Sequence, residues 1–503
     1  MQISDRSQRS SSPRVAGDLG VNGTETHTAY VFMVGDVVFK AKKPIRTAFV
    51  DFGTAEKRRE ACEREVALNQ RLCPDVYLGV AQLIDPGGVE AEPLVKMRRM
   101  PADRRLALLV TKDSDSHPFL DTIAELVAHF HARAERSAEI DRDATADAIT
   151  VRWGANVSEV SGYQCDVLSE VEIDEVDRRA RRYLRGRKDL FDNRIRESRV
   201  VDGHGDLLAD DIFCLPDGPR VLDCLDFDEH LRHVDGVDDA ACLAMDLEYL
   251  GREDLASRFL DRYCLEAADQ PPDSLRHHYI AYRAFVRAKV ACLRYMQGSL
   301  AASEDARLHC RLALRHLRVG TVRLALVGGL PGTGKSTLAR GLSERTGAVV
   351  ISSDRVRKEL AGLDASSRQV SEFGEGLYTG TMTDRTYAEM LRRAATHLAA
   401  GQSVILDASW TLSGFRQHAD LVASRSHSDL VELRCTAPRD VAIGRIRNRP
   451  LGDSDATPAV YDAMSAQAAP WTSATEVDTA AAPEESLAAA ERIWHSTSEW
   501  RKD

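Results

Sequence analysis

The sequence predicts a multidomain chain, with an α+β front part and an α/β back part built on a parallel sheet. The chain has 503 residues, more than one ordinary hydrophobic core organises. Near its start, strand-like runs surround one amphipathic helical run, a pattern typical of a small mixed lobe. From residue 320 an apolar strand leads through a glycine-rich loop into a helix, the pattern that opens a parallel α/β sheet.

The front part begins with two β-rich runs, AYVFMVG and DVVFKAKKPI, which Gly35-Asp36 separates as a turn. Residues 55–72 have helical spacing, and two further strand-like runs, VYLGVAQLI and EAEPLVKMRRMP, follow them. Residues 117–200 are mostly helical in pattern. The segment FCLPDGPRVLDCLDF then has a strand-like pattern with a turn at Pro216 to Gly218, and helices continue to residue 318.

These changes of pattern indicate the domain boundaries. We expect a disordered tail at residues 1–22, because this stretch is rich in serine and basic residues and lacks apolar periodicity. The front domain is expected at 23–302, a connecting helix at 303–318, and the back domain at 319–503.

Composition excludes several classes of protein. The formal net charge of −11 argues against general nucleic-acid binding, which requires a basic surface. The ten cysteines include no CxxC pair, which argues against a zinc ribbon. No apolar run approaches the roughly 20 residues needed to cross a bilayer, and the start lacks the apolar segment of a secretion signal. We therefore expect a cytoplasmic protein without a membrane partner; the oligomeric state is not indicated.

Residues 329–336, GLPGTGKS, match the nucleotide phosphate-binding pattern GxxxxGK[ST] at every fixed position. The strand RLALVGG precedes them and the amphipathic run STLARGLSERTG follows. Glycines let backbone amides turn toward phosphate oxygens, and the helix start adds a favourable dipole. Lys335 is expected to reach the β- and γ-phosphates and Ser336 to ligate Mg²⁺. The residues predicted to contact ATP or GTP here are Gly329, Leu330, Pro331, Gly332, Thr333, Gly334, Lys335, Ser336 and Thr337.

Acidic residues follow two later strands of the back domain. Asp354 comes just after VVISS, where it can take the proton of an attacking hydroxyl, and Arg357 one turn later can hold a substrate phosphate. The alternative role of Asp354 is a helix N-cap. Asp407 ends the strand SVILD, a pattern that holds the water shell of Mg²⁺, although a strand-end turn residue has the same pattern.

In RDVAIGRIRNR, Arg445 and Arg449 fall on one helical face, where they can cover the transferring phosphates. The alternative is a solvated charged face. Together with GLPGTGKST, SSDRVRKEL and VILDASW, this segment resembles the small P-loop kinases grouped with polynucleotide 5′-kinase and zeta-toxin-like enzymes. The resemblance covers about residues 320–470. It implies phosphoryl transfer from ATP to a hydroxyl, with Asp354 as the base and Arg357 as the substrate clamp.

A second acidic constellation lies in VVDGHGDLLADDIFCLPDGPRVLDCLDFDEH. Asp206 could accept a hydroxyl proton, while Asp211 and Asp226 could hold Mg²⁺ if the chain turns back between them. Residues 202–248 contain fourteen acidic residues against two Arg or Lys. Such a density is costly unless a metal or cationic ligand offsets the repulsion, although most of these acids are expected to be solvated. His204 is expected to be structural and to hydrogen-bond the backbone.

This segment resembles aminoglycoside phosphotransferase-like enzymes, which share the two-lobed protein-kinase-like fold. That family's loop reads HGDxxxxN; here HGDLLADD supplies its His, Gly and first Asp, and LDF its later Asp. Lys40 resembles the strand lysine that contacts the α- and β-phosphates, and Glu65 the helix glutamate that pairs with it. Lys42, on the same strand face, competes with Lys40 for that role. Asp211 stands where the family has Asn.

The order of the two modules is similar to that of bacterial bifunctional aminoglycoside phosphotransferase/ATP-binding proteins. We therefore predict an ATP- and Mg²⁺-dependent phosphotransferase with two nucleotide sites, which transfers γ-phosphoryl groups to hydroxyls of small molecules. One alternative is a regulatory or stress switch whose front module binds ATP without catalysis, a reading motivated by Asp211. Another is a toxin-like kinase that acts on a sugar nucleotide.

Overall fold

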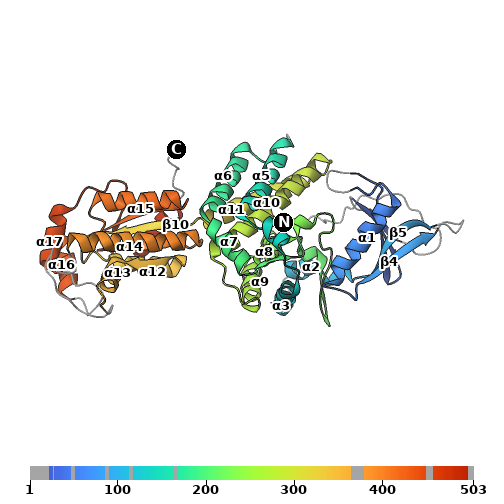
Figure 1. Ribbon diagram of the computed structural model, residues 1–503, viewed down its shortest axis with the longest axis horizontal. Helices are drawn as coiled ribbons and strands as arrows, with labels where there is room; N and C mark the ends of the chain where they lie inside the picture. The colour runs from blue at the N-terminus through green and yellow to red at the C-terminus, as the bar shows by residue number, and fades with distance from the viewer. Residues whose placement is uncertain are drawn as a thin grey trace. The chain divides into compact units, whose positions relative to one another are not determined.

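The computed structural model describes residues 22–25, 28–46, 51–84, 90–112, 117–163, 167–363, 379–448 and 457–496 (Figure 1). The tail predicted at residues 1–22 lies outside these ranges except for Asn22, where the first strand begins. The chain forms two compact units. Unit 1 extends to Ala148 and also contains Arg194–Pro271 and Tyr282–Leu312, while unit 2 contains Ile149–Asn193, Pro272–Ala281 and the chain from Ala313 onward.

Unit 1 opens with an antiparallel sheet of five strands in the order β1-β2-β3-β5-β4. The strands are β1 (Asn22–Glu25), β2 (Ala29–Val34), β3 (Val37–Lys42), β4 (Tyr77–Ile84) and β5 (Glu90–Arg98). Helix α1 (Ala55–Gln70), which the hydroxyl of Thr54 caps, packs on this sheet through Cys62 and Val66. The predicted mixed lobe is therefore present, with its helix between β3 and β4.

The remainder of unit 1 is mainly helical, with two short antiparallel strand pairs, β6–β9 and β7–β8. The turn between β7 and β8 is Pro216-Asp217, within the predicted turn. The elements are η1 (Ala102–Arg104), α2 (Leu106–Thr111), α3 (His117–Arg133), α4 (Ala138–Asp143), β6 (Val200–Asp202), η2 (Ala209–Asp211), β7 (Ile212–Leu215), β8 (Gly218–Val221), η3 (Glu229–Leu231), β9 (His233–Asp235), α8 (Gly236–Tyr249) and α9 (Glu253–Glu266).

The division between the units falls within four helices, namely α5 (Ala146–Gly162), α7 (Lys188–Arg196), α10 (Asp273–Met296) and α11 (Ala302–Val319). Helix α6 (Glu170–Gly186) belongs to unit 2. The compact units therefore do not follow the linear division predicted at residues 302 and 319, because α6 and the start of α10 group with the later residues. Helix α11 occupies the position of the predicted connecting helix.

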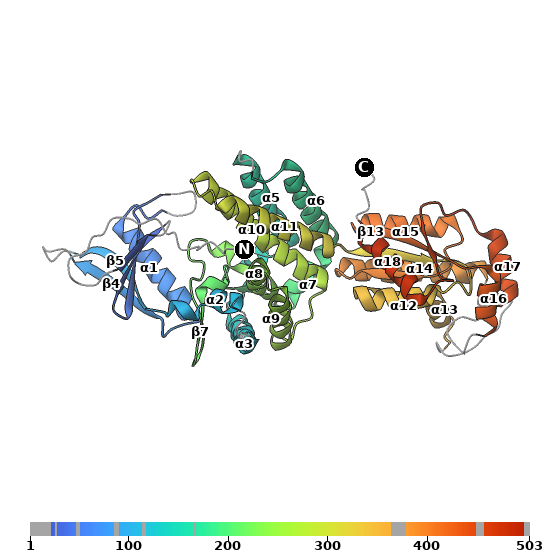
Figure 2. The same ribbon diagram turned by 180° about the vertical axis from the view of Figure 1, so that it is seen from behind.

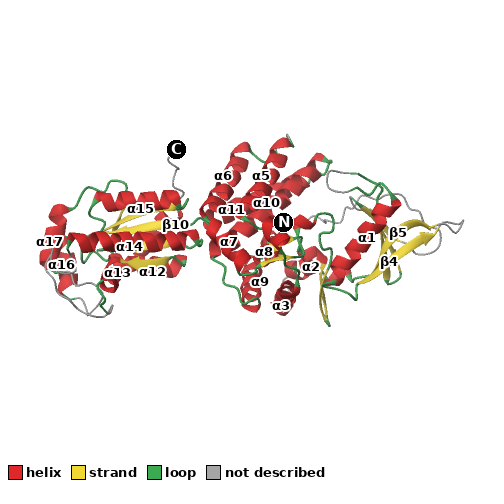
Figure 3. Ribbon diagram, viewed as in Figure 1, coloured by secondary structure: helices red, strands yellow, loops and turns green. Residues whose placement is uncertain are grey.

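Unit 2 contains a parallel sheet in the order β11-β12-β10-β13-β14. Its strands are drawn yellow among red helices in Figure 3. Its strands are β10 (Arg323–Gly328), β11 (Val349–Ser352), β12 (Val404–Asp407), β13 (Asp429–Thr436) and β14 (Thr475–Asp478). Its other helices are α12 (Lys335–Thr346), α13 (Ser353–Leu360), α14 (Gly380–Ala399), α15 (Ser413–Arg425), α16 (Arg439–Arg447), α17 (Pro458–Gln467) and α18 (Pro483–His495).

Strand β10 lies at the centre of this sheet, and all its residues are buried. Its residues Ala325 and Val327 pack with Leu338 of α12 and Trp494 of α18 in one core cluster. Helices α12 and α18 lie on the face of the sheet that is toward the viewer in Figure 2, and α14 and α15 lie on the opposite face, toward the viewer in Figure 1. Covering both faces of a parallel sheet explains why its strands are continuous apolar runs rather than alternating ones. The phosphate-binding pattern follows β10 directly, at the carboxyl edge where α/β sheets bind ligands.

The predicted architectures are confirmed: an antiparallel sheet followed by a mainly helical region in the front part, and a parallel sheet with the glycine loop after its central strand in the back part. Among the helices within the described ranges, none combines the length and the apolar character that crossing a bilayer requires.

Candidate active sites

The loop of residues 329–334 requires its glycines. Gly329, Gly332 and Gly334 have φ of 136°, 77° and 83°, a region that disfavours other residues. A Cβ on Gly329 would lie 2.5 Å from the carbonyl oxygen of Cys435, and one on Gly332 would lie 2.4 Å from that of Ala442. Neighbouring backbone therefore closes around the loop and allows no side chain at these positions.

Lys335, the first residue of α12, turns back toward this loop. Its Nζ donates a hydrogen bond to the carbonyl oxygen of Leu330 at 3.0 Å. Thr333 bonds the same oxygen at 2.8 Å, and its own carbonyl accepts from the hydroxyl of Thr479 at 2.6 Å. Ser336 and Thr337 are exposed in the first turn of α12. The ammonium group and the helix start thus lie where a phosphate chain would be held.

Asp354 and Arg357 form an ion pair on α13, with Nη1 of Arg357 2.9 Å from Oδ1 of Asp354. Asp354 is not the N-cap of the helix, because Ser352 occupies that position. Burial raises the pKa of the Tyr387 phenol. The charge of Arg357 lowers this pKa and that of Asp354 raises it, so the phenol lies beside the ion pair. Tyr387 also contacts the hydroxyl of Ser409 at 3.1 Å.

Asp407 is buried at the end of β12, opposite Val327 of β10 and Ser352 of β11. Burial raises the pKa of the Cys435 thiol to about 12, a rise that Lys335 opposes and Asp407 reinforces. Lys335 and Asp407 therefore act on the same buried thiol. The sheet brings the predicted phosphate lysine and the predicted magnesium carboxylate to one region at the strand ends.

Arg445 also reaches the phosphate loop. Its Nη2 donates to the carbonyl oxygen of Thr479 at 2.7 Å, and its Nη1 would lie 3.7 Å from a Cβ on Gly334. The predicted partner Arg449 lies outside the described residues. Sequence reasoning missed Tyr387, Ser409 and Thr479, because single polar residues without a spaced pattern carry no signal until the fold places them beside the loop.

In the front site, Lys40 and Lys42 both form ion pairs with Glu65. Lys40 Nζ lies 2.9 Å from Oε1 of Glu65, and Lys42 Nζ lies 2.7 Å from Oε2. Burial alone would raise the pKa of Glu65, but the two ammonium groups hold it at about 2. Lys40 further contacts Asp223 at 3.2 Å, and Lys42 contacts Asp226 at 2.6 Å. The two candidate lysines therefore differ in which later carboxylate they face.

Three carboxylates gather beside this pair. Burial raises the pKa of Asp211 well above its ordinary value, and the nearby charges of Asp223 and Asp206 raise it further. Asp226, which the sequence predicts as a magnesium ligand together with Asp211, pairs with Lys42 at 2.6 Å. The sequence contains two Leu-Asp pairs, Leu222-Asp223 and Leu225-Asp226. Only the second is followed by an aromatic residue, as in the LDF that was matched to the later Asp of the family, so Asp223 was not among the predicted residues.

The buried carboxylate of Asp239 hydrogen-bonds the backbone of the loop that carries Asp206. Asp239 accepts from the backbone amides of His204 at 2.6 Å and Gly205 at 2.9 Å, and from His131 at 3.0 Å. Although burial opposes it, the hydrogen bond and charge of His131, together with the charge of Arg283, hold the pKa of Asp239 well below its usual range. His204 contacts the carbonyl oxygen of Leu222 at 3.1 Å and so has the expected structural role.

Comparison with known proteins identifies relatives of the entire chain. The uncharacterized protein Rv2004c of Mycobacterium tuberculosis is 47% identical over 472 residues, which cover 94% of this chain and 95% of that protein. The uncharacterized protein Mb2027c of Mycobacterium bovis matches to the same extent. The chain belongs to the same family as these mycobacterial proteins. Within it, residues 324–471, from β10 to the segment before β14, match a family described as an AAA domain.

Solved kinases are similar to separate portions of the chain. A choline kinase from Cryptosporidium parvum covers 59% of this chain and 88% of its own, with 10% identity and a TM-score of 0.40. The GDP and kanamycin complex of APH(2")-IIIa covers 59% and 93%, with 17% identity and a TM-score of 0.38. The APS kinase CysC of Mycobacterium tuberculosis covers 35% and 99%, with 16% identity and a TM-score of 0.27.

Proposed function

We propose that this protein is an ATP-dependent phosphotransferase with two nucleotide sites, each of which transfers a γ-phosphoryl group to a hydroxyl of a small molecule. The observation that carries the proposal is the glycine loop at the end of β10, with Lys335 turned toward it and the Asp354–Arg357 pair two strands away. A phosphate cradle alone fits any nucleotide hydrolase. The added carboxylate of Asp354, after the end of β11 in the same sheet, supplies a base for a hydroxyl acceptor.

In the back site, Asp354 accepts the proton of the acceptor hydroxyl as its oxygen attacks the γ-phosphorus. The bond from that phosphorus to the bridging oxygen of the nucleoside diphosphate then breaks. Arg357 fixes the orientation of Asp354 through their 2.9 Å contact and offers further donors to the acceptor. Lys335 and Arg445 offset the charge that spreads over the transferring oxygens. Ser336 and Asp407 supply the oxygen ligands suited to Mg²⁺.

In the front site, Asp206 is the proposed base, because its half-exposed side chain stands on the loop that Asp239 holds rigid. Lys40, aligned by Glu65, is the proposed phosphate ligand. Asp211 and Asp223 supply carboxylates for Mg²⁺, whose charge would relieve the repulsion that raises the pKa of Asp211. Asp226 is assigned to aligning Lys42.

The test is single-turnover transfer from γ-labelled ATP into a filtered cell extract, with products separated by mass. Lys335→Ala should remove one set of labelled products and Asp206→Ala a different set, while each variant retains the other set. A result in which neither substitution changes any labelled species would refute the proposal.

One observation favours a different role for the front module. Asp211 places a third carboxyl group beside Asp206 and Asp223, where the resembled enzymes have a neutral Asn, and burial together with these two acids raises its pKa well above the ordinary value. A module that binds nucleotide to change conformation, without transfer, fits such a site. In that case Lys335→Ala protein would still bind ATP at the front module, but would label no acceptor from the extract.

A further inference from the structure

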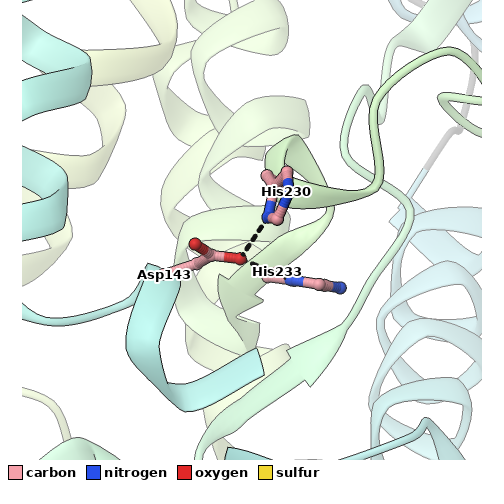
Figure 4. A group of neighbouring side chains, drawn as sticks. All are labelled: Asp143, His230 and His233. Atoms are coloured by element: carbon pink, nitrogen blue, oxygen red, sulfur yellow. Dashed lines mark hydrogen bonds and ion pairs between the residues drawn. The ribbon is translucent and has the colours of Figure 1, made fainter. Parts of the chain in front are cut away.

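Unit 1 contains a cluster of metal-binding side chains that the proposed phosphotransferase chemistry does not use (Figure 4). Asp143 is the last residue of α4, His230 lies in η3, and His233 begins β9. Nδ1 of His230 is 2.9 Å from Oδ2 of Asp143, and Nδ1 of His233 is 2.6 Å from the same oxygen. One ligand atom from each residue lies within 4.8 Å of the others.

The three side chains come from elements that the fold holds together. Helix α4 packs against both β6 and β9. Ile140 of α4 and Val200 of β6 share a buried core cluster, and β9 pairs with β6 in antiparallel register. The carboxylate of Asp228 accepts from the backbone amide of His230 at 3.0 Å and so fixes the start of η3. The packing of these elements therefore fixes the positions of the three side chains.

We propose that Asp143, His230 and His233 form a binding site for a divalent transition metal of the Zn²⁺ class. Two imidazole nitrogens and one carboxylate oxygen are donors that Zn²⁺ prefers, and three protein ligands leave a fourth position for water. Ligand atoms of a tetrahedral Zn²⁺ site are about 3.3 Å apart. The two nitrogen–oxygen separations of 2.6 and 2.9 Å are shorter than this by well under 1 Å, and all three ligand atoms lie within 4.8 Å of one another, so metal binding requires small side-chain movements.

Metal binding at this cluster requires no change in the charge of neutral imidazoles. In the metal-free arrangement each Nδ1 carries the proton that it donates to Asp143. On binding, each ring moves its proton to Nε2 and presents the lone pair of Nδ1 to the metal. His233 is 9% exposed and Asp143 26%, whereas His230 is 59% exposed, so the ion enters beside His230.

The position of the cluster suggests what a bound metal would do. Arg232, between the two histidines, donates to Asp202 at 2.8 Å and to the carbonyl oxygen of Leu225 at 2.9 Å. A Cβ on Gly205 would lie 3.1 Å from the side chain of Arg232. A metal that ties η3 to α4 would therefore restrain the segment that supports the loop of Asp206. The site itself stands independently of the proposed phosphotransferase function.

The experiment uses Co²⁺ as a spectroscopic probe on the full-length protein after chelator treatment and desalting. We expect one equivalent of Co²⁺ to give the intense visible absorption of a four- or five-coordinate site, and Zn²⁺ to displace it. Carboxylate sites that suit Mg²⁺ are octahedral and would give only weak bands. His230→Ala should abolish the intense band. His129→Ala is the matched control, because this exposed histidine bonds only its own helix at Glu125 in the described contacts.

A second measurement separates a metal site from a simple hydrogen-bonded cluster. Added Zn²⁺ should raise the melting temperature of the wild type and of His129→Ala, but not that of His230→Ala or Asp143→Ala. Loss of a direct ligand should weaken Co²⁺ binding by at least the 10–100-fold that loss of an outer partner causes. An intense band that persists in His230→Ala, or a wild type that gives no such band, would overturn the proposal.

Discussion

The Nζ atom of Lys40 lies 2.9 Å from Oε1 of Glu65, a carboxylate that is only 1% exposed. Lys42 holds the other oxygen at 2.7 Å, so one buried acid aligns two lysines. Lys40 is 20% exposed and also faces Asp223, whereas Lys42 is 4% exposed and faces Asp226. We therefore expect Lys40, the more open lysine and the one next to the gathered carboxylates, to be the phosphate ligand.

Substitution of the two lysines should therefore have different effects. Lys40→Ala should lower the kcat/KM of the front activity by about 100-fold or more, the effect of losing a charge contact to phosphate. Lys42→Ala should mainly lower stability, because it leaves Glu65 and Asp226 partly unpaired. The measurements are front-site kinetics in a Lys335→Ala background and thermal melting. A larger kinetic loss for Lys42→Ala would reverse the assignment of the two lysines.

The roles of Asp223 and Asp226 can be distinguished by how strongly front-site activity depends on Mg²⁺ in variants of each residue. Asp223→Asn should raise the Mg²⁺ concentration for half-maximal front activity by about tenfold or more, because a charged oxygen ligand is lost. Asp226→Asn should shift it by less than about threefold, since its carboxylate serves Lys42. Activity titrated with Mg²⁺ at saturating ATP gives both values. Equal shifts for the two variants would contradict the assignment.

The backbone of the phosphate loop provides a matched pair of glycine substitutions. Gly332 and Gly362 have φ of 77° and 71°, so alanine at either position costs about 1–2 kcal/mol of left-handed strain. At Gly332 the new Cβ would also meet the carbonyl oxygen of Ala442 at 2.4 Å, whereas at Gly362 nothing lies within 4 Å. Gly332→Ala should therefore destabilise the protein more and weaken nucleotide binding at the back site. Denaturation and ATP titration of both variants test this. Similar losses of stability and of ATP affinity in the two variants would show that the backbone at Ala442 moves aside at little cost.

The back site was predictable from the sequence because its chemistry lies in a contiguous pattern. A glycine loop between a strand and a helix fixes the positions of Lys335 and Ser336 by local geometry alone. The carboxyl ends of parallel strands then bring Asp354 and Asp407 to the same edge without knowledge of any side-chain contact. Arg445 could be placed on a helix, but its contact with Thr479 depends on β14, which no spacing rule connects to it.

The front site was less predictable because its residues are far apart in the chain. The sequence could not rank Lys40 against Lys42, since both lie on one strand face and both reach Glu65. Asp223 was not among the predicted residues because LDF at residues 225–227 matched the family's later Asp, and the φ of 63° at Asp223 is a conformation that no local pattern of apolar residues predicts. The grouping of α6 with the later residues likewise reflects contacts between residues far apart in the chain, such as Arg182 of α6 with Asp429 of β13 at 2.9 Å, which a composition change does not indicate.

Asp246 gives a prediction about pH. It is half-buried on α8 and accepts from the backbone amide of Ala209 at 2.8 Å. Burial raises its pKa to about 6 from an ordinary value of 3.8. The folded protein therefore keeps this proton in a range where the unfolded chain has released it. The unfolding free energy consequently falls as the pH rises from about 4 to about 6, by a total of about 3 kcal/mol for this group.

Asp246→Asn should remove this pH dependence while an amide oxygen continues to accept from Ala209. We expect the variant to match the wild type near pH 4 and to be more stable than it at pH 7.5 by about 2–3 kcal/mol, measured by denaturant unfolding at both pH values. The comparison uses the difference between the proteins, so titration of other groups cancels to first order. A difference that does not change with pH would mean that Asp246 is ionised in the folded protein throughout, with Arg287 and the Ala209 amide outweighing its burial.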